Sequence, residues 1–328
     1  MSNFDRNLFI EPTVKQYGSH MVMTNVHKPN KTKYVNIDTR FRDEYNNNEL
    51  VNYNVTLPER INDIKQITVK SVELPMTMYN ISSALGNNYF KITNDLPTNN
   101  IDYGTTIITL DDGMYDLTSL GAEIQNKINA TDYKFNYLKY RIRNNKSEFY
   151  REVDNGDNDD STQEPNLILN FAVDKYGNFD KYNFKSKLGW LLGYRKLEYT
   201  IKHQYDVNPV DPYLYEISDT IIDLNGSKYL YLAVDEFSKN NPQSFVTPLP
   251  TSFINKSIIA RITLDKKNYS FNTILPANTY NGLLVSDVRT YTGKIDIQKL
   301  NLQLLNDFGS PISLNGMDFS LCLEVEYE

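Results

Sequence analysis

The 328-residue sequence is poor in residue types on which several protein classes depend. It has one cysteine (Cys322), one tryptophan, three histidines and 14 glycines. A single cysteine excludes an intramolecular disulfide framework, a cysteine-rich zinc site and an iron–sulfur cluster. No apolar run approaches the roughly 20 residues of a membrane-spanning helix, and the first residues lack the basic start and apolar stretch of a secretory signal. We therefore expect no membrane span, no export signal and a fold that depends on packing alone.

The charge balance is acidic. The chain has 34 basic and 41 acidic residues, a net charge of −7 and a pI near 5.2. An acidic chain has no general electrostatic attraction for nucleic acid, although a local basic patch is still possible. Asparagine and tyrosine are abundant, with 40 and 25 residues. The composition indicates a globular protein without nucleic acid as its expected partner.

The usual signatures of catalysis are missing from the sequence. It contains no nucleophile elbow, no phosphate-binding loop, no dinucleotide glycine motif and no HExxH. His20, His27 and His203 lack metal-ligand spacing, and Cys322 alternates with apolar residues, as a buried or edge thiol does. We expect no metal, no cofactor and no enzyme activity. A carbohydrate hydrolase stays open because its paired carboxylates come together only in space.

An acidic run, DNGDNDD at 154–160, has the two-residue spacing of a calcium loop. Its glycine is misplaced for an EF-hand, and Pro165 stands where the closing glutamate is needed. We interpret this run as a solvated loop.

Alternation of apolar and polar residues predicts a strand-rich fold. The clearest example is 317–327, where Phe319, Leu321, Leu323 and Val325 alternate with polar residues. Similar patterns predict strands at 34–38, 50–57, 61–75, 89–92, 105–110, 167–173, 197–203, 219–224, 228–234, 256–264, 268–275 and 294–305. One apolar stripe at helical spacing predicts a helix over about 117–130, with Asp116 or Thr118 as its cap. The predicted fold is mainly β, an antiparallel β-sandwich or jelly roll with one clear α-helix and long loops.

Two organisations of the chain fit this pattern. In the first organisation, residues 1–33 form an extended N-terminal arm and residues 34–328 form the sandwich body, which is divided into two sub-domains near 154–165. A single sandwich with a long inserted excursion fits equally well. The arm has scattered apolar residues, which favours either a disordered lead-in or a segment that becomes ordered on a partner surface. Its candidate partner-contact residues are Phe4, Leu8, Phe9, Ile10 and Tyr17.

A second candidate contact surface lies in 134–151. Lys139, Arg141 and Arg143 alternate with Leu138, Tyr140 and Ile142, which places the basic residues on the outer face of a strand. Aromatic residues between them permit base stacking. The acidic run next to them favours instead a salt-bridged face or a contact with an acidic protein.

Several segments resemble the minor structural proteins of nucleocytoplasmic large DNA viruses, the giant and algal viruses. The resemblance lies in YVNIDTRFRDEYNNNELVNYNVTLPERI (34–61), ITVKSVELPMTMYNISSALGNNYFKI (67–92), DDGMYDLTSLGAEIQNKIN (111–129) and IDIQKLNLQLLNDFGSPISLNGMDFSLCLEVEY (295–327). It weakens at 1–33 and around 150–215. It implies a minor capsid or penton-type protein of the virion, assembled in the host cytoplasm by contacts with other capsid proteins, and with further copies of itself. A glycan- or receptor-binding sandwich of a viral fibre or surface protein is the alternative.

Overall fold

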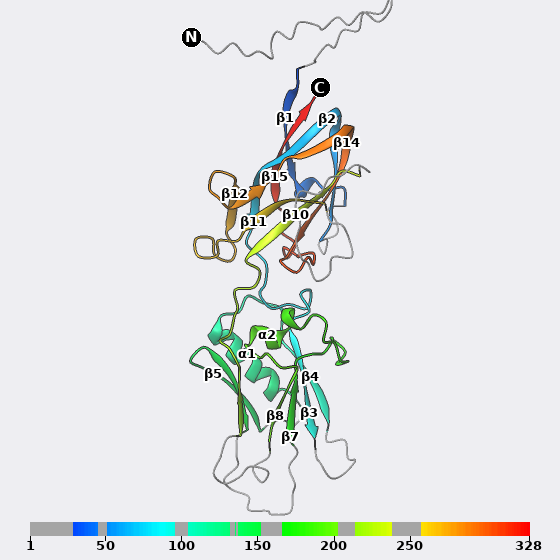
Figure 1. Ribbon diagram of the computed structural model, residues 1–328. Coiled ribbons are helices and arrows are strands. Elements are labelled where there is room, and N and C mark those ends of the chain that lie inside the picture. The colour runs from blue at the N-terminus through cyan, green and yellow to red at the C-terminus, as the bar shows by residue number, and fades with distance from the viewer. Residues whose placement is uncertain are drawn as a thin grey trace, which may run out of the picture.

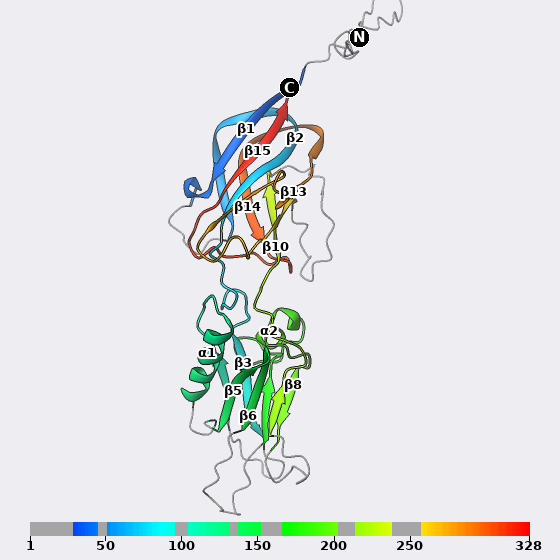
Figure 2. The same cartoon turned by 90° about the vertical axis from the view of Figure 1, so that its left-hand side faces the viewer.

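The computed structural model describes residues 29–44, 51–95, 104–131, 135, 137–151, 166–202, 214–237 and 257–328. Within these ranges the chain forms two lobes that lie end to end (Figures 1 and 2). All strand pairs are antiparallel, which confirms the predicted fold class. No helix in the described ranges has the length and apolar character needed to cross a membrane.

The first lobe contains one eight-stranded sheet that folds around a large main core. The strand order is β1 (Lys31–Asp38), β15 (Ser320–Tyr327), β2 (Tyr53–Pro75), β14 (Arg289–Leu305), β10 (Tyr229–Asp235), β11 (Ile258–Thr263) and β13 (Leu284–Ser286), and β12 (Ile274–Asn278) also pairs with β2. Several register shifts interrupt the β2–β14 ladder. Such irregularities bend long strands, so the sheet can enclose the apolar residues of both strands.

The second lobe has a separate core between two smaller sheets. One sheet has the order β4 (Thr105–Thr109), β3 (Tyr89–Asp95), β7 (Asn166–Asn170) and β8 (Glu198–Ile201), and the other has β5 (Leu138–Arg143), β6 (Lys146–Arg151) and β9 (Tyr215–Ile217). The helices are α1 (Leu117–Asn129), α2 (Leu188–Leu191) and the short 3-10 turn η4 (Phe184–Ser186). Rings of Phe90, Phe149, Phe171 and Tyr194 meet in this core.

The predicted helix is confirmed as α1, which begins one residue after Asp116. The Asp116 carboxylate accepts the backbone N–H of Ser119 at 2.7 Å, and the Ser119 hydroxyl accepts the N–H of Asp116 at 3.0 Å. This reciprocal cap satisfies two backbone donors that a helix start leaves unpaired. Leu120, Ile124 and Ile128 point into the second core.

The second lobe is inserted into the first between β2 and β10. The chain leaves β2 through residues 76–80 and returns through 224–228. Asn80 joins these two connections, because its side-chain amide donates to the carbonyls of Tyr115 at 2.8 Å and Leu224 at 3.2 Å. Residues 152–165, where the sequence predicts a division, lie outside the described residues. The flanking strands, β6 and β7, both contribute to the second core.

Two predicted strands are wrong. Residues 219–224 form no strand, since their N–H groups bond to loop carbonyls, such as that of Ile222 to Asn145. Residues 268–273 form a turn in which Asn272 has a positive φ of 65°, and β12 begins only at Ile274. The predicted strands at 50–57 and 61–75 belong to one strand, β2, which continues through residues 58–60 and through Asp63 despite its positive φ of 57°.

Candidate functional site

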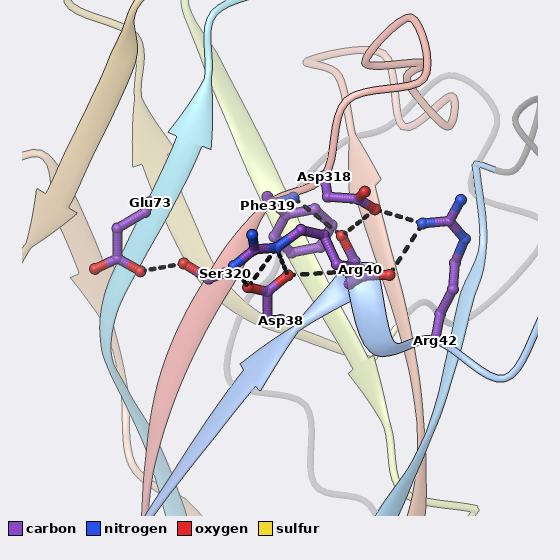
Figure 3. A network of polar contacts seen from close by, with 8 residues as sticks. Asp38, Arg40, Arg42, Glu73, Asp318, Phe319 and Ser320 are labelled. Carbon is purple, nitrogen blue, oxygen red and sulfur yellow. Dashed lines mark hydrogen bonds and ion pairs between the residues drawn. The ribbon is translucent and has the colours of Figure 1, made fainter. Parts of the chain in front are cut away.

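The motif Asp38-Thr39-Arg40-Phe41-Arg42 forms a polar network where β1 ends (Figure 3). Thr39 donates its backbone N–H to the carbonyl of Phe319 at 3.0 Å, and its hydroxyl donates to the Asp318 carboxylate at 2.8 Å. The buried Arg42 side chain forms an ion pair with Asp318 and donates to the carbonyl of Thr39 at 3.0 Å. The network therefore attaches the 3-10 turn η2 (Thr39–Phe41) to the segment that leads into β15.

The outer half of this network is open to solvent. Arg40 forms an ion pair with Asp38 at 2.6 Å, and hydrogen bonding to this guanidinium lowers the pKa of the Asp38 carboxyl. The Phe41 side chain is 76% exposed. One strand further into the sheet, the Ser320 hydroxyl donates to Glu73 at 2.6 Å (Figure 3). These groups satisfy one another, as the polar residues of a structural joint do.

The predicted basic face lies on β5, at the edge of the three-stranded sheet. Arg141 and Arg143 are exposed and Lys139 is half-buried, on the side of the strand opposite the core. Arg141 forms an ion pair with Glu148 on β6 at 2.5 Å, and its guanidinium lies 4.5 Å from the ring centre of Tyr150. A neighbouring strand thus neutralises part of this face. Its role as a contact surface stays a prediction.

Residues 174–184 form a largely exposed loop that ends at the buried Phe184, and we call it the tyrosine loop. Its sequence, DKYGNFDKYNF, contains a short motif twice in tandem. In each copy an aspartate accepts the backbone N–H of the tyrosine two residues later, Asp174 from Tyr176 at 2.8 Å and Asp180 from Tyr182 at 3.1 Å. Such turns fix the local backbone. The two tyrosine side chains are 71% and 85% exposed.

The tyrosine loop is anchored to the second lobe at both copies of its motif. Asp180 forms an ion pair with the buried Lys187 at 2.8 Å, and hydrogen bonding to Lys187 lowers the pKa of the Asp180 carboxyl. The Gly177 carbonyl accepts from Lys91 on β3 at 3.2 Å. Gly177 has a φ of 81°, and a Cβ there would lie 2.9 Å from Ile107. The exposed rings are therefore presented on a fixed support.

A cavity of about 440 Å³ lies where the two lobes meet. Trp190 and Met114 of the second lobe and Phe271 of the first contribute apolar walls. Lys266 lines the cavity too, where burial lowers the pKa of its ammonium group, which donates to the carbonyl of Asn225. The volume of this cavity and its position between two lobes are typical of ligand pockets. Residues of the two connections between the lobes also line this cavity.

The other predicted site residues are placed as follows. Phe4, Leu8, Phe9, Ile10 and Tyr17, the three histidines and the acidic run at 154–160 lie outside the described residues. Cys322 lies half-buried on β15, where burial raises the pKa of its thiol. Within the described ranges, no group of three or more His, Cys, Asp or Glu side chains is arranged to hold a metal ion.

The sequence predictions missed the tyrosine loop. Its tandem repeat is nevertheless visible in the sequence. The cavity had no such local signal, because its walls come from segments far apart in the chain.

Comparison with known proteins gives a similarity at the level of structure. No protein-family model matches the chain, and no curated protein matches it. Among solved structures, the chain is similar to the mavirus penton protein, known from a crystal structure of its selenomethionine-labelled form. The similarity has a TM-score of 0.42 with 11% sequence identity, and it covers 92% of this chain and 100% of that chain.

Proposed function

We propose that this chain is a non-enzymatic structural component of a large icosahedral DNA virus particle, of the minor capsid or penton type. It acts by non-covalent contacts with other capsid proteins in the virion and is assembled in the host cytoplasm. The resemblance of four segments to minor structural proteins of large DNA viruses supports this role.

The observation that carries the proposal is the fixed display of aromatic side chains. Tyr176 and Tyr182 stand out from a loop whose backbone is anchored to β3 and to the buried Lys187. Exposed aromatic groups supply large contact areas in protein interfaces, and a rigid loop loses little entropy when it binds. Such a surface suits a building block that must meet its neighbours in one geometry.

The residues of the resemblance motifs fit the same role. Asp38 holds the turn that follows β1, Arg42 and Glu73 join neighbouring segments of the first lobe, and Asn80 joins the two connections between the lobes. These side chains are engaged in contacts within the chain. They support a scaffold and leave recognition to the exposed loops.

The test is the protein composition of purified particles. Virions are stripped of loosely bound material, cross-linked and analysed by mass spectrometry. We expect the chain in the icosahedral shell, with cross-links from Lys175 or Lys181 to a capsid protein, because both lysines lie beside the exposed rings. Absence from the stripped shell would contradict the proposal, as would turnover of a substrate by the purified chain.

A matched pair of variants sharpens this test. The double variant Tyr176→Ser with Tyr182→Ser removes both rings of the tyrosine loop and should lower incorporation into particles. Tyr280→Ser removes a fully exposed ring on the first lobe and serves as the control. Equal incorporation of both variants would show that the tyrosine loop is not the contact surface.

The tyrosine loop also favours a second candidate function, glycan binding at a viral surface. The Lys175 and Lys181 ammonium groups lie 4.9 and 5.7 Å from the ring centres of their neighbouring tyrosines. Exposed rings with adjacent cations can stack on sugars and contact acidic substituents. A glycan array probed with the purified chain tests this function. Binding that the double tyrosine variant loses would support it, and an array without signal would contradict it.

A further inference from the structure

The strand β1 forms one end of the eight-stranded sheet. Among the described residues its one strand partner is β15, and its other side has none. The β1–β15 register runs from Lys31 opposite Tyr327 to Asp38 opposite Ser320 without a shift. β1 is therefore a regular edge strand of eight residues.

The register defines which backbone groups of β1 face away from β15. Thr39 donates its N–H to Phe319, the residue opposite it when the register is continued by one step. In an antiparallel pair, residues that exchange such bonds alternate with residues whose N–H and C=O point outward. The outward groups therefore belong to Thr32, Tyr34 and Asn36. No described residue bonds to their backbone on that side.

Beyond Lys31, an exposed lysine at its start, the edge has little of the usual protection against strand addition. Natural edge strands carry prolines, bulges or free charges that prevent pairing with another chain. β1 contains no proline and no bulge, and its Lys33 is held in an ion pair with Glu59 on β2. The three residues with outward backbone groups are exposed, and the Tyr34 side chain is 62% exposed. An extended segment can add to such an edge by main-chain hydrogen bonds.

Asn30, the residue before β1, is held away from this edge. The Asn30 side chain donates to Glu326 on β15 and accepts from Lys65 on β2 at 2.8 Å. Asn30 is thus held on the side of β15, opposite the open edge. Figure 1 shows that β1 begins at the end of the first lobe, beside the C-terminus. The 28 residues before Pro29 could span up to roughly 90 Å when extended, enough to reach another molecule.

We propose that the open edge of β1 receives the N-terminal segment of a second copy of this chain as an added strand. This inference rests on the proposed assembly function and names the surface that the arm contacts. The segment around Leu8, Phe9 and Ile10 is its most strand-prone part, since aromatic and β-branched residues favour strands. Its aromatic residues can pair with the exposed Tyr34 ring across the new strand boundary.

The experiment compares Asn36→Pro with Asn36→Ala in the full chain. Proline removes the outward N–H and sets its ring against an incoming strand, while the contacts with β15 use the neighbouring residues. Alanine removes the same side chain and keeps the N–H. We expect self-association of the proline variant to be roughly tenfold weaker or more in sedimentation velocity, and that of the alanine variant to match the original chain. Thr32→Pro repeats the test if Asn36→Pro fails to fold.

Hydrogen exchange gives the second measurement. We expect the amides of Tyr34 and Asn36 to become protected as the concentration of the full chain rises. Protection that does not depend on concentration would mean that the added strand comes from the same molecule, and this would overturn the proposal. A monomer at all concentrations, or equal association of the proline and alanine variants, would overturn it too.

Failure of this inference can be told apart from failure of the assembly function. If Asn36→Pro enters purified particles normally and the chain is monomeric, the edge proposal fails and the structural role stands. If the chain associates through β1 but is absent from particles, the structural role fails and the edge proposal stands.

Discussion

Removing one partner of the buried ion pair between Arg289 and Glu236 should strongly destabilise the first lobe. Both side chains are 0% exposed and lie 2.8 Å apart. The Arg289 guanidinium also donates to the carbonyls of Val234 and Ser257, each at 2.8 Å. It therefore joins β10, β14 and the residue before β11. The hydroxyl of Tyr291 donates to the second Glu236 oxygen at 2.8 Å.

Replacing Glu236 by alanine leaves the Arg289 charge buried without its counter-ion. Loss of one partner of a buried pair costs about 3–5 kcal/mol of unfolding free energy. With a urea m-value of about 1–3 kcal/mol per molar, the midpoint should fall by roughly 1–5 M. Tyr291→Phe removes one hydrogen bond to a charged group and should cost about 1.5–3 kcal/mol. Burial and the Glu236 carboxylate raise the pKa of Tyr291, so its hydroxyl remains a donor at neutral pH.

Urea unfolding followed by two signals tests this prediction. Trp190, the one tryptophan, lies in the second lobe, so its fluorescence reports that lobe, while far-ultraviolet circular dichroism reports both. We expect Glu236→Ala to shift the dichroism transition and leave the fluorescence transition in place. The double variant Glu236→Ala with Arg289→Met removes both charges and should recover most of the loss. A double variant as unstable as the single one would refute the reasoning.

Three further predictions concern other contacts. Gly193→Ala should lower the unfolding free energy by roughly 2–4 kcal/mol, because φ at Gly193 is 94° and a Cβ would lie 2.2 Å from the carbonyl oxygen of Thr220. The control is Gly293→Ala, whose Cβ would have no atom within 4 Å and which should leave the melting temperature unchanged. Asn80→Ala should cost about 2–4 kcal/mol in urea unfolding, because it leaves half-buried peptide groups of Tyr115 and Leu224 without their partner. A loss below 1 kcal/mol, roughly one net hydrogen bond, would argue against this joint. Hydrogen bonds from two lysines lower the pKa of Glu328 to about 2. The stabilisation that the Glu328 carboxylate contributes should therefore be present above the ordinary carboxyl pKa of 4.5 and lost as the pH falls toward 2. Melting curves of Glu328→Gln should differ from those of the original chain at pH 7 and converge with them near pH 2.

The sequence patterns predicted those elements whose structure depends on residues close together in the chain. The alternation at 317–327 yields β15 because one face of that strand packs on the core of the first lobe. Asp116 yields the start of α1 because its cap needs only residues three positions apart. In both cases the decisive contacts are visible in a short window of sequence.

The missed features depend on contacts between distant residues. Ile222 is apolar and buried, as in a strand, but its N–H bonds to a carbonyl of the β5–β6 turn. Glu236 and Arg289 are 53 residues apart, and nothing near either one indicates a buried partner. The alternation of Lys139, Arg141 and Arg143 is visible in the sequence, whereas the pairing of Arg141 with Glu148 depends on the register of a hairpin.

The polar network at the end of β1 helps to keep the open edge of the same strand in a regular conformation. An edge strand can accept a new partner only while its own sheet holds it in a regular conformation, because outward N–H and C=O groups must stay in line. At one end of β1, Thr39 and Arg42 bind the segment before β15, and at the other end Asn30 binds Glu326 and Lys65. Both attachments use side chains on the β15 side and leave the opposite side open. The motif that carries the viral resemblance thus stabilises the strand to which we assign the contact between copies.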